Sequence, residues 1–347
     1  MPTKMWFLPL RNGRRFSRRR IALLLMLSLT LFVASCVATE GTPDAEPAPG
    51  VDEPDVGPQT DPGPTAFVPD APLGYPSTDV VTRIGRDDAL DIATWNIENF
   101  PGAAGSAQQI AELIASMDLD IVVVEEITTE DAFNEIDDRL PYHYSALSSH
   151  TYSDGSSQKL GIFYRRDLLE MDSFSLLYSG TYEFPRPVIR AHFTLVDDRY
   201  APFDFTLLGL HLKAGTQTED RSRRADANVK LEEFVRGQVA GSADDDIVIL
   251  GDFNEVLTTS AGRGVFSPWS DENLYTIHTQ RLSDDDKVSF FPGNRLIDHI
   301  ISTRSFSDVV NGFLPRIPDL ETQVLNYEDN VSDYLPVVLP VPLTLVE

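Results

Sequence analysis

The sequence predicts an α/β fold of four layers, in which two mixed β-sheets pack face to face and helices cover their outer faces. Short apolar strands alternate with amphipathic helices from residue 80 onwards. Some strands alternate apolar and polar residues, as a sheet with one buried face does, and others are continuous apolar runs, which indicate burial on both faces. Two packed sheets covered by helices accommodate both kinds of strand. Nothing in residues 80–347 indicates a second folded domain.

The first predicted elements form a strand–helix–strand unit. Residues 91–97 favour a strand, and residues 107–117 place apolar side chains at helical spacing. Residues 120–124 contain a run of β-branched side chains that is typical of a buried strand. The remaining predicted elements are strands over 160–164, 188–196 and 203–212, a helix over 221–239, and strands over 246–250, 295–302 and 334–345.

Residues 1–35 have the three parts of an export signal. A basic stretch ends at Arg20, an apolar run follows, and small residues lead to Cys36, the only cysteine of the chain. The end of this segment resembles a bacterial lipobox, in which the cysteine is acylated and becomes the new N-terminus. We therefore expect an exported protein that is lipid-anchored to the outer membrane or cell surface. The alternative is an uncleaved anchor, and the arginines fit either Sec or twin-arginine export.

Residues 36–79 predict a disordered linker. They are rich in proline and acidic residues and contain no basic residue. Such a segment offers too little apolar surface to offset the entropy cost of ordering the chain. We expect it to hold the folded domain away from the membrane.

The net charge limits the classes of substrate. The formal charge of the whole chain is −26, and seven of its 28 basic residues lie before Cys36, where there is no acid. The mature chain therefore has 28 − 7 = 21 basic and 54 acidic residues, a charge of −33. This surface argues against tight electrostatic binding of a nucleic-acid backbone. It leaves open a phosphodiester substrate that is held through a divalent cation.

Polar side chains recur at the ends of the predicted strands. Strand ends on one edge of packed sheets can converge on a cleft. Carboxylates and amides in such a cleft favour Mg²⁺, with Mn²⁺ and Ca²⁺ as alternatives, and no thiolate is present to favour zinc. The residues in this pattern are Asn96, Glu125, Glu126, His211, Asp252, Asn254, Asp298 and Asp333.

Six motifs in these positions resemble the endonuclease/exonuclease/phosphatase family, the phosphoesterases related to deoxyribonuclease I. Their order and spacing agree over about 255 residues, the length of the family's whole domain. The resemblance implies a deoxyribonuclease I-like sandwich and divalent-metal hydrolysis of phosphoesters. The motifs are Trp95-Asn96-Ile97, residues 120–127 with Glu125-Glu126, Gly209-Leu210-His211-Leu212-Lys213, Gly251-Asp252-Phe253-Asn254, Leu296-Ile297-Asp298-His299-Ile300 and Ser332-Asp333-Tyr334.

The resemblance also implies a role for each residue. Glu126 corresponds to the main metal ligand, with Asn96 and Asp333 nearby. His211 and Asn254 correspond to groups that hydrogen-bond the phosphoryl oxygens, and Asp252 to the residue that positions or deprotonates the attacking water. Asp298 corresponds to the carboxylate of a proton-transfer dyad. Arg186 matches a phosphate-contacting arginine in a looser alignment.

Other polar residues have a structural interpretation that we prefer. Glu125 stands where the family commonly has Gln, and we expect it to support the site by hydrogen bonding. His299 follows Asp298 on a strand, so its side chain should point to the opposite face. Arg221, Arg223 and Arg224 fit either a phosphate-facing cluster or a solvated helix face, and we favour the second.

The last motif departs from the family at one position. The family has Ser-Asp-His, and this chain has Ser332-Asp333-Tyr334. Tyrosine has an unperturbed pKa near ~10 against ~6.5 for histidine, so it is a poor base at neutral pH. It can still donate a hydrogen bond to a phosphate oxygen or act as an acid towards the leaving group.

Three functions are therefore open. The leading hypothesis is a metal-dependent phosphodiesterase at the cell surface, a nuclease with a nucleic-acid substrate, acting as a monomer. The second is a phosphatase or phospholipase acting on small phosphorylated substrates or lipid headgroups, which the acidic surface favours. The third is a non-catalytic surface binding protein, which Tyr334 suggests.

Overall fold

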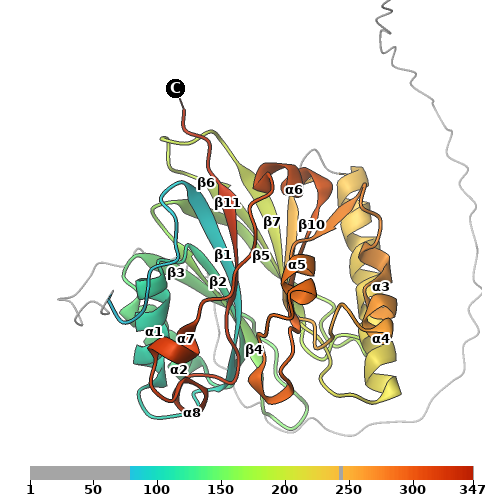
Figure 1. Cartoon of the computed structure of the whole chain (residues 1–347), viewed down its shortest axis with the longest axis horizontal. Coiled ribbons are helices and arrows are strands. Elements are labelled where there is room, and N and C mark those ends of the chain that lie inside the picture. The colour runs from blue at the N-terminus through green and yellow to red at the C-terminus, as the bar shows by residue number, and fades with distance from the viewer. Residues whose placement is uncertain (1–78, 242–244, 347) are drawn as a thin grey trace, which may run out of the picture. The chain divides into compact units, whose positions relative to one another are not determined.

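Two β-sheets stack between two layers of helices (Figure 1). The structure is a computed structural model that describes residues 79–241 and 245–346. The predicted leader, Cys36 and all of the predicted linker except Asp79 lie outside the described residues. The four-layer α/β sandwich that the sequence predicts is confirmed.

The first sheet has five strands. β1 pairs in parallel with β2 and antiparallel with β11. Its outer face is covered by helices α1 (Ser106–Met117) and α2 (Glu130–Arg139). In spatial order its strands are β11 (Val337–Pro342), β1 (Ala89–Phe100), β2 (Ile121–Ile127), β4 (Lys159–Arg165) and β3 (His143–Leu147).

The second sheet has six strands. β7 and β8 are parallel neighbours, and β10 pairs antiparallel with β8. Helices α3 (Thr218–Gly241) and α4 (Ser260–Val265) cover its outer face. In spatial order its strands are β5 (Leu169–Leu177), β6 (Val188–Leu195), β7 (Asp204–His211), β8 (Ile247–Asp252), β10 (Asp298–Thr303) and β9 (Tyr275–Ile277).

Short helices occupy the connections between these elements. They are η1 (Ser267–Trp269), α5 (Gln280–Asp284), η2 (Phe291–Gly293), α6 (Arg304–Val310), α7 (Leu320–Gln323) and α8 (Tyr327–Asn330). No helix of the described residues is long and apolar enough to span a membrane.

Strand alternation divides the apolar side chains into three cores. In β1, Trp95 and Ile97 face the helices α1 and α2, whereas Leu90 and Ile92 face the second sheet. A third cluster lies between the second sheet and α3, where Leu231 is buried. The same alternation decides which polar side chains reach the space between the sheets.

Several elements were missing from the sequence prediction. The strands β3 and β5 are edge strands with partly exposed side chains, and β9 is a short edge strand of three residues. Helix α2 is mostly polar and buries only three residues. Their apolar patterns are too short or too weak to stand out from a loop. The strand predicted over 295–302 begins only at Asp298, because Arg295 pairs with Phe290 in a turn.

Candidate active site

A layer of polar side chains ends the core between the two sheets. Along β7 the residues that face the first sheet are Leu207, Gly209 and His211, and along β8 they are Val248, Leu250 and Asp252. In each of these two strands, the last residue that faces the first sheet is polar. His211 lies opposite Asp252 in the parallel pair of strands, and both are buried.

The first sheet contributes its polar side chains through an irregularity. The register of β1 on β2 shifts after Asn96, and that of β2 on β4 shifts after Val124. Glu126 lies in this bulge with a φ of 66°, in the left-handed region that glycine favours. A non-glycine residue in that conformation costs roughly 1–3 kcal/mol and is typical of functional sites. The bulge lets Glu126 reach the site although Glu125 occupies the inward position.

Four side chains are in direct contact at the centre of the site. The Asn96 amide Nδ2 donates to Glu126 Oε1 at 3.2 Å and to Asp252 Oδ2 at 3.3 Å. His211 Nε2 lies 3.4 Å from Asp252 Oδ2 and 3.8 Å from Glu126 Oε1. The backbone N–H of Asn99 donates to Glu126 Oε2 at 3.0 Å. Both sheets therefore meet at one cluster of hydrogen-bonding groups.

Asp298 joins this cluster from β10. It pairs directly with Asp252 across the two antiparallel strands and is fully buried. Its Oδ2 accepts a hydrogen bond from the Ser289 hydroxyl, and within the described residues its Oδ1 has no partner. The next residue, His299, packs on the opposite face against Phe253, as strand alternation predicts.

Asp333 and Tyr334 approach from the segment before β11. The N–H of Asp333 donates to Glu98 Oε2 at 3.2 Å, and the Tyr334 ring lies 4.6 Å from the ring of Phe290. Tyr334 is near enough to Asp252 and Asp298 for their charges to act on its hydroxyl. The hydrogen bonds of Tyr334 to described residues are made by its backbone: its N–H donates to Ser332, and its carbonyl accepts from Trp95 and Tyr327.

Arg186 and Asn254 meet at one carbonyl oxygen. Arg186 Nη1 and Asn254 Nδ2 both donate to the carbonyl of Leu212, each at 3.2 Å. Arg186 also donates to the side chain of Gln158. Because Leu212 follows His211, both residues lie at the rim of the same cluster.

Burial and mutual repulsion shift the protonation of the carboxylates. Burial, together with the Glu126 charge, raises the pKa of Asp252 to about 7. Burial and the charges of Glu98 and Glu126 raise the pKa of Asp333 to about 7, and burial raises that of Asp298 well above its usual value. Excess negative charge is therefore concentrated here with little water to screen it.

The imidazole of His211 and the phenol of Tyr334 are both held in their neutral forms. Burial lowers the pKa of His211 well below its usual value, and the nearby Arg186 charge adds to this. Burial and the surrounding carboxylates raise the pKa of Tyr334 above the usual value for a phenol. At neutral pH the tyrosine hydroxyl is therefore a hydrogen-bond donor and cannot accept a proton as a base.

Residues 93–333 match the model of the Endonuclease/Exonuclease/phosphatase family, and the match ends one residue before Tyr334. The chain belongs to this family. Its members hydrolyse phosphoester bonds, generally with divalent metals. Among curated proteins, no relative matches the sequence.

Several solved structures of other proteins have the same fold. TDP2 of D. rerio, in complex with a single-strand DNA product, has 13% identity and a TM-score of 0.55, covering 73% of this chain and 99% of that one. A mannosyl-6-phosphatase of Bacteroides thetaiotaomicron has 17% identity and a TM-score of 0.51, covering 74% and 100%. A family member from Bacteroides vulgatus has 16% identity and a TM-score of 0.53, covering 74% and 99%.

The residues of this endonuclease/exonuclease/phosphatase domain fit a hydrated hard cation. Among the described residues, no three His, Cys, Asp or Glu side chains form a complete ligand set. Mg²⁺ commonly keeps several waters and binds through one or two carboxylates plus substrate phosphates. Glu126 and Asp333 suit this arrangement, because the described residues leave Asp333 Oδ1 buried without a partner and the cluster has excess negative charge.

One predicted surface residue proves to be buried. Arg224 lies inside the domain, where it donates to the carbonyls of Lys213 and Gly215 and pairs with Glu255 at 2.7 Å. The prediction of a solvated face is wrong for this residue, because helix α3 turns it towards the loop that follows β7.

Supporting residues of the site were missed in the sequence. Glu98 holds the N–H of Asp333, Ser289 binds Asp298, and Thr94 donates to Glu125 at 2.6 Å. Glu98 directly follows the Trp95-Asn96-Ile97 motif, and this position in the sequence could have identified it as a candidate. Ser289 has no such signal, because only the tertiary fold brings it to Asp298.

Proposed function

We propose that this chain is a divalent-metal phosphodiesterase, a nuclease exported and held at the cell surface by a lipid on Cys36. The observation that supports this most directly is the contact of Glu126, Asn96, His211 and Asp252 at one end of the core between the sheets. The cluster combines a metal-binding carboxylate, a neutral imidazole and a carboxylate whose pKa is raised to about 7. These are the groups needed to orient a phosphodiester and activate water.

Each residue has a role in this proposal. Asp252 holds the attacking water and accepts its proton, and Asn96 keeps Asp252 in place. Neutral His211 and Arg186 donate hydrogen bonds to non-bridging phosphate oxygens, with Asn254 beside them at the Leu212 carbonyl. Glu126 and Asp333 would hold a divalent cation such as Mg²⁺, which would supply charge to polarise a phosphate oxygen and to offset the negative charge of the transition state.

Tyr334 takes part as a donor. The charges of Asp252 and Asp298 act on its hydroxyl, and its raised pKa keeps the proton on oxygen. We propose that it donates to the oxygen of the leaving group or to the phosphate. The proton-transfer pair with Asp298 that the family builds with histidine is absent, so turnover is expected to be slow.

The activity is tested on the mature chain with two substrate types. Incubation with plasmid DNA and with bis(4-nitrophenyl) phosphate should give cleavage in Mg²⁺ or Mn²⁺ that EDTA abolishes. Cleavage of neither substrate by a protein that still unfolds cooperatively would contradict the proposal. Activity in EDTA equal to that in Mg²⁺ would contradict the metal requirement.

A phosphatase is the second candidate, because the mature chain has a charge of −33 and one structural neighbour is a mannosyl-6-phosphatase. The same assay includes hexose 6-phosphates and glycerophosphodiesters. Phosphate release from these, without nicking of plasmid DNA, would replace the nuclease proposal with this one.

The membrane attachment depends on one side chain. In the producing bacterium, the native chain is expected in the membrane fraction and Cys36→Ser in a soluble fraction, because a thioether-linked lipid requires the cysteine sulfur. Equal distribution of both forms would contradict lipid anchoring.

A further inference from the structure

Arg223, in the first turns of α3, lacks the acidic partner that Arg221 and Arg224 beside it have. Lys213 pairs with Asp220 at 3.1 Å, and Arg221 and Arg224 both pair with Glu255. Arg223 forms no ion pair with a carboxylate anywhere in residues 79–241 or 245–346, and its Nε is buried without a hydrogen-bond partner. Arg224 also has an unpartnered Nε although Glu255 neutralises it, so it is the absence of a paired carboxylate that leaves the Arg223 charge available to an anion.

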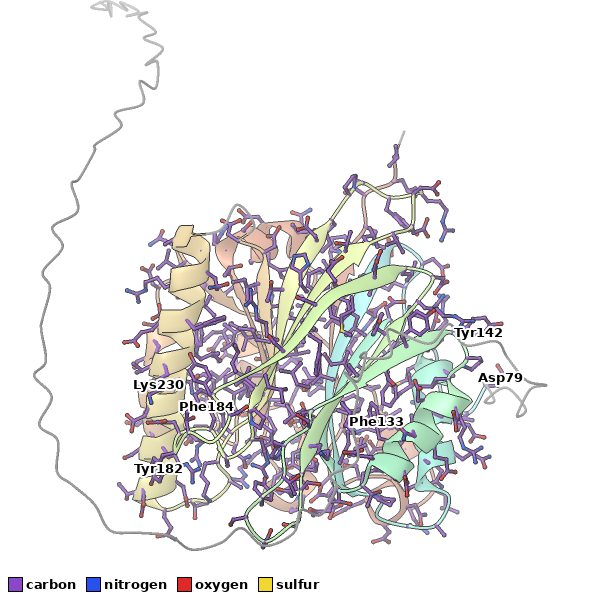
Figure 2. All side chains as sticks on the ribbon, turned by 180° about the vertical axis from the view of Figure 1, so that it is seen from behind. Asp79, Phe133, Tyr142, Tyr182, Phe184 and Lys230 are labelled. Atoms are coloured by element: carbon purple, nitrogen blue, oxygen red, sulfur yellow. The ribbon has the colours of Figure 1, made fainter. Side chains whose placement is uncertain are left out.

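Arg223 is held in place by an aromatic ring. Its guanidinium carbon lies 4.5 Å from the ring centre of Tyr182. The Tyr182 hydroxyl donates to Glu219 at 2.9 Å, which fixes the ring, and the side chain is 58% exposed. Figure 2 shows Tyr182 beside the lower end of α3, the end that follows the site strand β7. One face of the ring therefore contacts Arg223 while much of the ring remains open to a ligand.

Tyr152 connects this pair to the catalytic cluster. Burial is the main cause of the raised pKa of its hydroxyl, and the charges of Arg186, Glu126 and Arg223 also act on it. Tyr152 therefore lies near all three charged groups. The chain also brings the Arg223–Tyr182 pair close to the site: Tyr182 lies four residues before Arg186, and Arg224, which follows Arg223, donates to the carbonyls of Lys213 and Gly215 just after β7.

We infer that Arg223 and Tyr182 form a subsite for the nucleotide next to the scissile phosphate, with its phosphate on Arg223 and its base against the open face of Tyr182. This inference rests on the proposed function and specifies its substrate as a single strand. Base stacking on an aromatic ring tolerates any sequence, and a guanidinium beside it binds the backbone.

The surrounding charge limits the subsite to a short contact. Glu219 binds the Tyr182 hydroxyl, and Glu183 lies nearby and pairs with Lys230 at 2.8 Å. Together with the −33 charge of the mature chain, these acids disfavour a long duplex that adds many phosphates. One added phosphate contact should give the rate a salt dependence of only about one counterion.

The test compares substrates with and without a neighbouring nucleotide. The mature chain and its Arg223→Ala variant are assayed on bis(4-nitrophenyl) phosphate and on a thymidine trinucleotide. The ratio of kcat/KM for the trinucleotide to that for the small diester should fall about tenfold in Arg223→Ala, mostly through KM, because a contact of this strength binds ground and transition states alike. Arg223→Lys should recover part of the ratio, and Tyr182→Ala should lower it.

Arg236→Ala is the matched control. Arg236 lies on the same helix, thirteen residues or roughly 20 Å further along, and is ion-paired with Glu232. Its replacement should leave the ratio unchanged, and the thermal midpoints of all variants are compared to exclude misfolding. An equal fall on both substrates in Arg223→Ala would overturn the subsite while leaving the phosphodiesterase intact.

Different experimental outcomes contradict the subsite and the proposed catalytic function. If the native chain hydrolyses neither substrate, the proposed function fails, and fluorescence anisotropy with a labelled trinucleotide then decides the subsite. Weaker binding by Arg223→Ala supports it. Equal binding by the two proteins, or tighter binding of thymidine 5′-monophosphate than of the trinucleotide, overturns it.

Discussion

Glu126→Gln is expected to lower kcat/KM for bis(4-nitrophenyl) phosphate about 10³-fold. The substitution removes the charge that binds the cation and keeps the size of the side chain, with one oxygen left to accept from either Asn96 or Asn99. A metal ion contributes several kcal/mol of charge stabilisation in the transition state, and about 4 kcal/mol corresponds to about 10³ in rate. Initial rates over a range of Mg²⁺ concentrations measure the effect.

Stability in the presence of metal gives a second readout of the same variant. A ligand at about 100 times its Kd stabilises a protein by about 2.7 kcal/mol, which raises Tm by roughly 5–10 °C for a domain of this size. The native chain should show this rise with Mg²⁺, and Glu126→Gln should not. Glu170→Gln, which neutralises an exposed carboxylate on β5, is the control and should keep both the rate and the rise. Retention of both in Glu126→Gln would exclude this residue as the ligand.

Tyr334→His is expected to raise kcat on a DNA substrate about 10²-fold. A histidine at this position, beside Asp298 and Asp252, restores a group that titrates near neutral pH. General acid–base catalysis contributes about 10²–10⁴-fold, and we expect the lower end because the surroundings are built around a tyrosine. The gain should be smaller on bis(4-nitrophenyl) phosphate, whose leaving group needs no proton.

Tyr334→Phe separates catalysis from mere binding. Removing the hydroxyl takes away one hydrogen bond in the transition state, and the rate on DNA should fall by about tenfold or more. Tyr144→His, at an exposed tyrosine on the edge strand β3, is the control and should match the native chain. If Tyr334→Phe has the native rate, the hydroxyl takes no part. If only Tyr334→His is active, the native protein is a binding protein.

The fold was predictable where strands are buried and not at the edges. The runs in β1, β2, β7 and β8 are apolar because both their faces are covered, so pattern alone locates them. The edge strand β5 shows little apolar periodicity, since one face and one edge meet solvent. Its position depends on pairing with β6, which no local pattern records.

Some residues of the candidate site could be predicted from local sequence, and others could not. Residues at motif positions, such as Asn96 and Asp252, were predictable because each follows a run of mostly apolar residues in the sequence. The positive φ of Glu126 and the contact of Ser289 with Asp298 depend on pairing between distant segments. The contact of Arg223 with Tyr182 could not be predicted either, because it joins α3 to the distant loop before β6.

The inward alternation that places His211 and Asp252 makes the site sensitive to strand length. Inserting or deleting one residue within β7 or β8 would rotate everything beyond it to the other face, and Asp252 would then point into the helix-covered core. A substitution elsewhere in these strands changes the packing but leaves the number of residues before His211 and Asp252 unchanged. The catalytic geometry is therefore specified by the number of residues that separate each polar side chain from the start of its strand. In relatives of this chain we expect substitutions within the strands, and insertions or deletions only in the loops between them.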